Sequence, residues 1–171
     1  WNSFMNLTAI TEFDQVITKH FLDSLSLVKV CDVAQAGRIL DVGTGAGFPG
    51  IPLKIAFPEV EVVLLDSLNK RVKFLNEVIG QLGLSKITAI HGRAEDFARQ
   101  KEYREQFDLV VSRAVANLSS LSEYCLPYVK VGGRFVSYKS GKLNEELAAA
   151  QKAIHVLGGE AKEPVYFQLT G

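Results

Sequence analysis

The residues best suited to bind a ligand gather in one stretch, DVGTGAGFPG, which spans residues 41–50. An apolar run precedes it and another follows it, a pattern that predicts a loop between a strand and a helix. Glycines let the backbone turn tightly and let a ligand approach main-chain N–H groups. The helix that follows adds the positive end of its dipole. The stretch therefore predicts a ligand-binding loop.

An acid, Asp66, follows the next predicted strand, EVVLL. Ligands of open α/β folds bind beyond the carboxyl ends of the strands, where both this acid and the loop would lie. A carboxylate there can accept two hydrogen bonds from a ribose diol. Together with the loop, Asp66 predicts a cofactor that contains adenosine.

The charge of Asp41 bears on which cofactor this is. Three loop glycines fit the G-x-G-x-x-G pattern, so a dinucleotide and an NAD-dependent oxidoreductase stay open. A carboxylate would repel a pyrophosphate, but it would attract an amine or a sulfonium. S-adenosyl-L-methionine carries both of these cations. A purely structural alternative is that Asp41 only caps amides of the loop.

Strand and helix patterns alternate along the chain. We predict strands over Arg38–Val42, Glu61–Leu65, Lys86–His91, Phe107–Ser112, Arg134–Lys139 and Val165–Leu169, and helices over Thr11–Val30, Pro49–Phe57, Lys70–Leu82, Ser119–Val129 and Leu143–Leu157. The strands are too uniformly apolar to have a face in water, which indicates a mostly parallel sheet covered on both sides, a doubly wound α/β fold. A single domain over 1–171 is expected, with a helical N-terminal flank over 1–36 and an α/β core over 37–171.

Composition limits the classes of protein. Lysine plus arginine and aspartate plus glutamate each number 19, so the formal net charge is zero, which argues against a strongly basic nucleic-acid binder but allows a local patch. Cys31 and Cys125 lie far apart without a CxxC spacing, so reduced, buried thiols and no metal site are expected. Neither a membrane span nor a signal-peptide pattern is present, which predicts a cytoplasmic protein. Both ends of the sequence look cut rather than finished.

The stretch DVGTGAGFPGIPL resembles the first motif of class I S-adenosylmethionine-dependent methyltransferases. With LLDSLNKRVKFL, GRAED, VVSRAVANL and WNSFMNLTAI…KHFLDSL, the chain is similar, from Trp1 to about Lys139, to the small-subunit (16S) ribosomal RNA guanine-N7 methyltransferases, the glucose-inhibited division protein B family. The resemblance implies a Rossmann-like class I methyltransferase fold and S-adenosyl-L-methionine as cofactor. That family usually has an extra N-terminal helical segment and a further C-terminal strand, so the C-terminal strand is expected to be missing here.

The resemblance also implies a cofactor site made by the loop and by the ends of the next strands. Its residues are Asp41, Gly43, Thr44, Gly45, Gly47, Phe48, Asp66, Ser67, Leu68, Ala94, Glu95 and Arg113. Glu95 could instead be a solvated acid at the start of a helix, where the dipole favours it.

Two arginines are the candidates for the catalytic role. Arg113 follows the fourth predicted strand and could contact the substrate base or the cofactor carboxylate, or form a structural salt bridge with Asp108 or Glu123. Arg93 is the second candidate. Guanine N7 has an in-plane lone pair and no proton to remove, so no general base is required. An arginine that donates to guanine O6 without covering N7 would orient the base.

Four further residues are expected to bind the substrate: His20, Lys70, Arg71 and Lys139. Lys70 and Arg71 fall in the first turn of a helix that Ser67 should cap, where cations oppose the dipole, and this favours a phosphate contact. By resemblance His20 lies near the mouth of the pocket, although a residue on a polar helix face is the alternative. Lys139 could reach an RNA phosphate.

The expected partner is ribosomal RNA, either free or in an assembling small-subunit particle, bound by a monomer. Because a neutral chain binds free RNA weakly at physiological salt, the particle is favoured. A small-molecule methyltransferase and a non-catalytic module that binds adenosine compounds or RNA remain alternatives.

Overall fold

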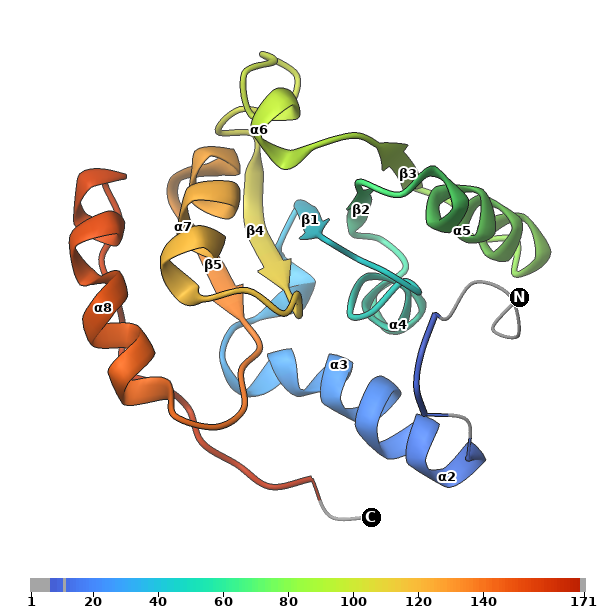
Figure 1. Ribbon diagram of the computed structural model, residues 1–171. Helices are drawn as coiled ribbons and strands as arrows, with labels where there is room; N and C mark the ends of the chain where they lie inside the picture. Colours follow the sequence, from blue (N-terminus) through green and yellow to red (C-terminus); the bar gives the residue numbers. More distant parts are fainter. Residues whose placement is uncertain (1–6, 11, 170–171) are drawn as a thin grey trace.

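The computed structural model describes residues 7–10 and 12–169. Five parallel strands form one sheet in the order β3-β2-β1-β4-β5 (Figure 1). They span Arg38–Val42 (β1), Glu61–Asp66 (β2), Ile87–His91 (β3), Phe107–Ser112 (β4) and Val129–Ser137 (β5). The strand order reverses between β1 and β4, which are direct neighbours. A crevice between strand ends is expected at this switch point.

Helices cover both faces of the sheet (Figure 1). They span Gly50–Ala56 (α4), Asn69–Gln81 (α5), Ala94–Phe97 (α6), Leu118–Cys125 (α7) and Leu143–Val156 (α8), with a 3₁₀ turn at Leu126–Tyr128. Neighbouring residues of β1 face opposite ways: Ile39 packs with the side of α4 and α5, and Leu40 with the side of α7. This alternation explains the uniformly apolar strands and confirms the doubly wound parallel sheet.

The N-terminal flank is a chain of short helical segments. α2 (Phe13–Val16), a π-helical segment (Ile17–Leu22), α3 (Asp23–Leu25) and a 3₁₀ segment (Ser26–Lys29) follow one another, and a 3₁₀ turn (Val33–Gln35) leads to β1. Leu27 is buried in the core beside the sheet, and Tyr138, just past β5, donates to the carbonyl of Ser24 at 2.6 Å. The flank is therefore anchored to the carboxyl ends of the strands (Figure 1). Thr11, where this helix was predicted to begin, lies outside the described residues.

Two strand predictions are wrong. Residues 165–169 form no strand: they pair with neither edge strand of the sheet, β3 or β5, and Val165, Tyr166 and Phe167 stay 50%, 68% and 39% exposed. The fifth strand, predicted over Arg134–Lys139, spans Val129–Ser137 instead, so Gly132 and Gly133 lie inside β5. The register shifts there, between Phe107 and Leu109 of β4, so the glycines sit in an irregular stretch of the ladder.

Ser67 does not cap the helix that follows β2. α5 begins at Asn69, with Leu68 in the cap position and no side-chain cap bond. Asp66 Oδ1 instead accepts the amide hydrogen of Leu68, the residue in the cap position, at 2.9 Å. Among the helices of the described residues, none is long and apolar enough to cross a membrane.

Candidate active site

The glycine loop turns sharply from β1 into α4 over residues 43–49. Gly45 has a φ of +60°, a conformation that glycine adopts without strain. Gly50 serves a different purpose, because a Cβ there would lie 2.2 Å from Leu64 Cδ2 and 2.9 Å from Asp41 Oδ2. The last glycine of the pattern therefore allows the helix to pack closely on β2, and the earlier one shapes the loop.

Asp41 is fully buried beneath this loop. Its Oδ2 accepts hydrogen bonds from the Thr44 hydroxyl at 2.7 Å and from the Gly50 amide at 2.9 Å. Its Oδ1 is buried without a hydrogen-bond partner among the described residues. Burial raises the pKa of Asp41 to about 7, against the effect of those two hydrogen bonds. Asp41 thus caps the loop, as the structural alternative expected, and keeps one acceptor unused.

Asp66 holds the loop from the neighbouring strand. Its Oδ2 accepts from the amide of Gly45 at 2.9 Å, and Arg71 Nη1 lies 3.6 Å from the same oxygen. Its Oδ1 is taken by Leu68. A carboxylate has about four lone-pair sites, so Asp66 has acceptor capacity left for a ribose hydroxyl. Arg71 is therefore engaged by this acid, whereas Lys70 is exposed.

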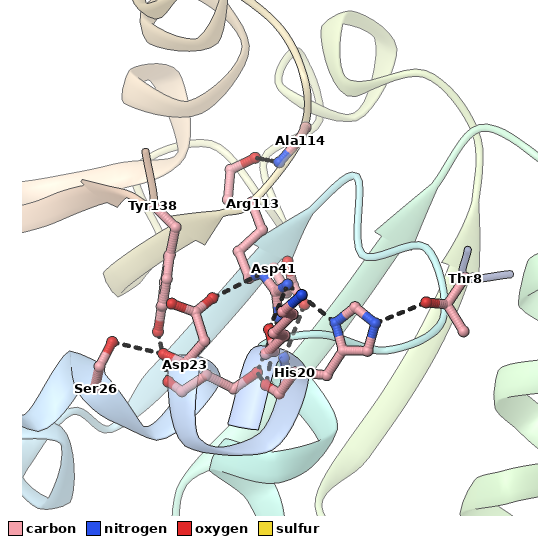
Figure 2. Close-up of polar contacts among 12 residues, drawn as sticks. Thr8, His20, Asp23, Ser26, Asp41, Arg113, Ala114 and Tyr138 are labelled. Carbon is pink, nitrogen blue, oxygen red and sulfur yellow. Dashed lines mark hydrogen bonds and ion pairs between the residues drawn. The ribbon is translucent and has the colours of Figure 1, made fainter. Parts of the chain in front are cut away.

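Arg113 reaches from the end of β4 to the helix of the N-terminal flank (Figure 2). Its Nε lies 3.2 Å from Asp23 Oδ2, and it donates from Nη1 to the Ser24 hydroxyl at 3.3 Å. The expected structural partners, Asp108 and Glu123, are wrong: Asp108 pairs instead with Lys130 at 3.4 Å. The true partners lie about 90 residues away in sequence.

His20 joins the same helix to the glycine loop. Its ring stacks on Phe48 with centroids 4.8 Å apart and planes 16° apart, and Phe21 meets Phe48 edge-on at 5.3 Å. The guanidinium carbon of Arg113 lies 5.8 Å from the centroid of Phe48. The flank, the loop and the end of β4 therefore meet at one aromatic ring.

The remaining expected residues lie in local networks. Arg93 is exposed and pairs with Glu95 at 3.0 Å, next to Ala94, whose carbonyl accepts from Tyr128. Lys139 is only 14% exposed in its side chain; it pairs with Glu146 at 2.7 Å and donates to the carbonyl of Ala116. The structure gives neither cation a contact with the cluster around Arg113. Ser67 and Leu68 are exposed beside Asp66.

Asp23 and Ser24 are parts of this cluster that the site prediction left out. They stand three and four residues after His20, a spacing that places all three on one side of a helix. That signal is visible in KHFLDSL, but the arginine that they bind is not, because only the fold brings it near.

The family described as "GidB: rRNA small subunit methyltransferase G" matches residues 1–169. Proteins named ribosomal RNA small subunit methyltransferase G from Lachnoclostridium phytofermentans and Clostridium tetani are 63% and 54% identical to this chain over 169 residues. Each match covers 99% of this chain and 70% or 71% of the relative.

Solved structures show a similar fold. A SAM-dependent O-methyltransferase from Thermotoga maritima has a TM-score of 0.63 at 19% identity, and the match covers 89% of this chain and 52% of that one. A SAM-dependent methyltransferase from Aquifex aeolicus has a TM-score of 0.61 at 17% identity, with 90% and 86% covered. At such identities the likeness concerns the fold alone.

Proposed function

We infer the function of this chain from its family: the chain belongs to the rRNA small subunit methyltransferase G (GidB) family. Membership in a family of methyltransferases favours a methyl donor over the nicotinamide dinucleotide that the glycine pattern left open. It also favours ribosomal RNA over a small-molecule acceptor. We propose that the chain transfers a methyl group from S-adenosyl-L-methionine to guanine N7 of small-subunit ribosomal RNA.

One observation carries the choice of cofactor: the unused oxygen of Asp41. A buried carboxylate oxygen without a partner is costly, and a cationic group placed beside it would remove that cost. S-adenosyl-L-methionine supplies a methyl group on a positively charged sulfur and an amine of the same charge. The loop residues Gly43, Thr44, Gly45, Gly47 and Phe48 would surround its methionine part.

The ribose and adenine would extend toward β2 and β3. Asp66 would accept from the ribose diol through the lone pairs that Gly45 and Leu68 leave free. Ser67 and Leu68 would border the adenine on one side, and Ala94 and Glu95 on the other. Because the side chain of Glu95 pairs with Arg93, the contact of Glu95 with the adenine would come from its main chain.

The chain needs no general base for the proposed reaction, because guanine N7 has no proton to lose. Catalysis would come from orientation, which can contribute up to about 7–11 kcal/mol when the reacting atoms are held in line. Arg113 is our first candidate to donate to guanine O6, and Arg93 the second. Lys70 would contact an RNA phosphate. Arg71 and Lys139 form ion pairs within the protein, and His20 accepts from Arg113.

The experiment is methyl transfer from radiolabelled S-adenosyl-L-methionine to deproteinised small-subunit RNA and to small-subunit particles, followed by nucleoside analysis. The expected product is 7-methylguanosine, formed faster on particles because a neutral protein binds free RNA weakly at physiological salt. A methylated base other than guanine would overturn the choice of atom. Faster reaction on free RNA would overturn the choice of particle.

A further inference from the structure

Arg113 is held by acceptors from one short segment of the N-terminal flank. Asp23 lies at Nε, the Ser24 hydroxyl and the His20 carbonyl accept from Nη1, and the Lys19 carbonyl and His20 Nδ1 accept from Nη2. The four contacts at Nη1 and Nη2 are hydrogen bonds, one for each of the four N–H donors there, and the contact at Nε is an ion pair. The contacts at Nη1 and Nη2 measure 3.2–3.4 Å, which is long for such bonds. The N-terminal flank therefore sets the orientation of the guanidinium. A substrate oxygen can accept a hydrogen bond from Nη1 or Nη2 only by displacing one of these acceptors.

The contact with His20 fixes which of its ring nitrogens carries hydrogen. A guanidinium has no acceptor, so His20 Nδ1, which lies 3.2 Å from Arg113 Nη2, must offer its lone pair. The hydrogen is then on Nε2, which donates to the Thr8 hydroxyl at 2.7 Å. A doubly protonated ring would have no lone pair for Arg113 and would bring two positive charges together. Only the neutral imidazole supports this arrangement.

Asp23 supplies the counter-charge of the cluster. Facing His20 are Arg113 from the end of β4 and Asp23 from its own helix, together with Phe48 from the loop and Thr8 from residues 7–10, which are uncharged. Burial and Arg113 lower the pKa of His20, and Asp23 opposes them. Without Asp23 the guanidinium would keep only neutral acceptors within this cluster.

We propose that Asp23 and the neutral imidazole of His20 are positioning residues that set the direction of Arg113 for the substrate guanine. Asp23 fixes the Nε side of the guanidinium. His20 occupies the Nη2 side as an acceptor that guanine O6 replaces when the base enters. The inference rests on the proposed function and assigns a task to residues that do not themselves touch the reacting atoms.

The first test compares Asp23→Asn with Asp14→Asn, a matched change at an exposed acid of α2. We expect Asp23→Asn to lower kcat on small-subunit particles by about tenfold or more, with affinity for S-adenosylhomocysteine within about threefold of wild type. Asp23→Glu should recover part of kcat, and Asp14→Asn should change nothing. Thermal unfolding of each variant shows whether it is folded. An unchanged kcat in folded Asp23→Asn would overturn the proposal, whereas an inactive wild type would overturn the proposed function instead.

The second test uses the pH profile of turnover, which a merely structural contact would not move. Wild-type kcat should fall on the acid side as His20 gains a proton, at a pH below the ordinary histidine pKa of 6.5. In His20→Asn the amide oxygen can accept from Arg113 at every pH, so the acid limb of its pH profile, measured relative to its own activity at pH 8, should move to lower pH. An acid limb at the same pH in both proteins would overturn the role given to His20.

Discussion

The two walls of the site are built in opposite ways. On the side of the proposed cofactor site, Asp41 and Asp66 bind the loop across 9 and 21 residues of sequence. On the other side, Arg113 binds His20 across 93 residues. The first wall is made of short connections between consecutive elements, and the second exists only once the sheet has formed. The proposed donor site is therefore made by connections between consecutive elements, whereas the Arg113 cluster depends on the whole fold.

The largest effect of a substitution is expected at Gly50, the most tightly packed point of the first wall. Gly50→Ala would place a methyl group 2.2 Å from Leu64 Cδ2, so either α4 or β2 must move. We expect a loss of about 1–3 kcal/mol in the free energy of unfolding, measured by urea denaturation. The control is Gly80→Ala in α5, where a Cβ would meet nothing within 4 Å. Equal stability of the two variants would show that the packing at Gly50 is looser than described.

The next effect separates binding from stability at Asp41. The amide oxygen of Asp41→Asn can still accept from Thr44 and Gly50, but the negative charge is lost. We expect the affinity for S-adenosyl-L-methionine to fall by about tenfold or more, because hydrogen bonds to charged groups are the strong ones. Stability at pH 8 should not fall, since a buried charge has been removed. Calorimetry and urea denaturation measure the two quantities, and a fall in stability with unchanged affinity would make Asp41 a loop cap only.

The pKa of Asp41 predicts a pH dependence of opposite sign for binding and for folding. Because this pKa is raised to about 7, the folded protein holds a proton that the unfolded chain has lost above its ordinary value of 3.8. This contribution to stability is therefore complete below pH 3.8 and declines as pH rises to about 7. Donor affinity should rise over pH 6–8 as the carboxylate ionises, by up to about tenfold per pH unit. Asp41→Asn should flatten both slopes, and a slope that persists would assign it to another group.

The smallest effect is expected at the edge of the first wall. Lys70 is an exposed cation in the first turn of α5. Lys70→Ala should weaken binding to small-subunit RNA by a few-fold and reduce the salt dependence of binding by about one counterion. It should also stabilise the protein by a few tenths of a kcal/mol, because a cation is removed from a helix N-terminus. Lys73→Ala, on the same helix, is the control, and equal RNA binding by the two variants would remove the phosphate contact.

The same contrast explains what the sequence could predict. The bounds of the strand Phe107–Ser112 could be predicted as the structure has them, because a short run of mostly apolar residues marks a buried strand. The loop was readable because glycine and aspartate there have few other reasons to occur together. In contrast, Val165–Leu169 has strand-like residues and no partner strand, and strand propensity cannot show whether a partner exists.

The errors inside the site have the same origin. Ser67 has the right side chain for a cap, yet α5 begins without a side-chain cap, and the carboxylate of Asp66 at the end of β2 accepts from the amide of Leu68 instead. Arg113 does follow a strand end, as predicted, but its ion-pair partner is distant in sequence. Asp108 was the nearer acid in sequence, and Asp23 was the nearer one in space.

The stacking of His20 on Phe48 has a consequence for the order of events on the enzyme. Phe48 belongs to the loop that would hold the methyl donor, and His20 belongs to the helix that would meet the RNA. Any influence that one ligand exerts on the other through this ring must be mutual, by thermodynamic linkage. If the ribosomal particle binds more tightly to protein that already holds the donor, then the donor binds more tightly, by the same factor, to protein that is already bound to the particle. Loss of the donor's methyl group would then also weaken binding to the particle, which links release of the particle to completion of the transfer.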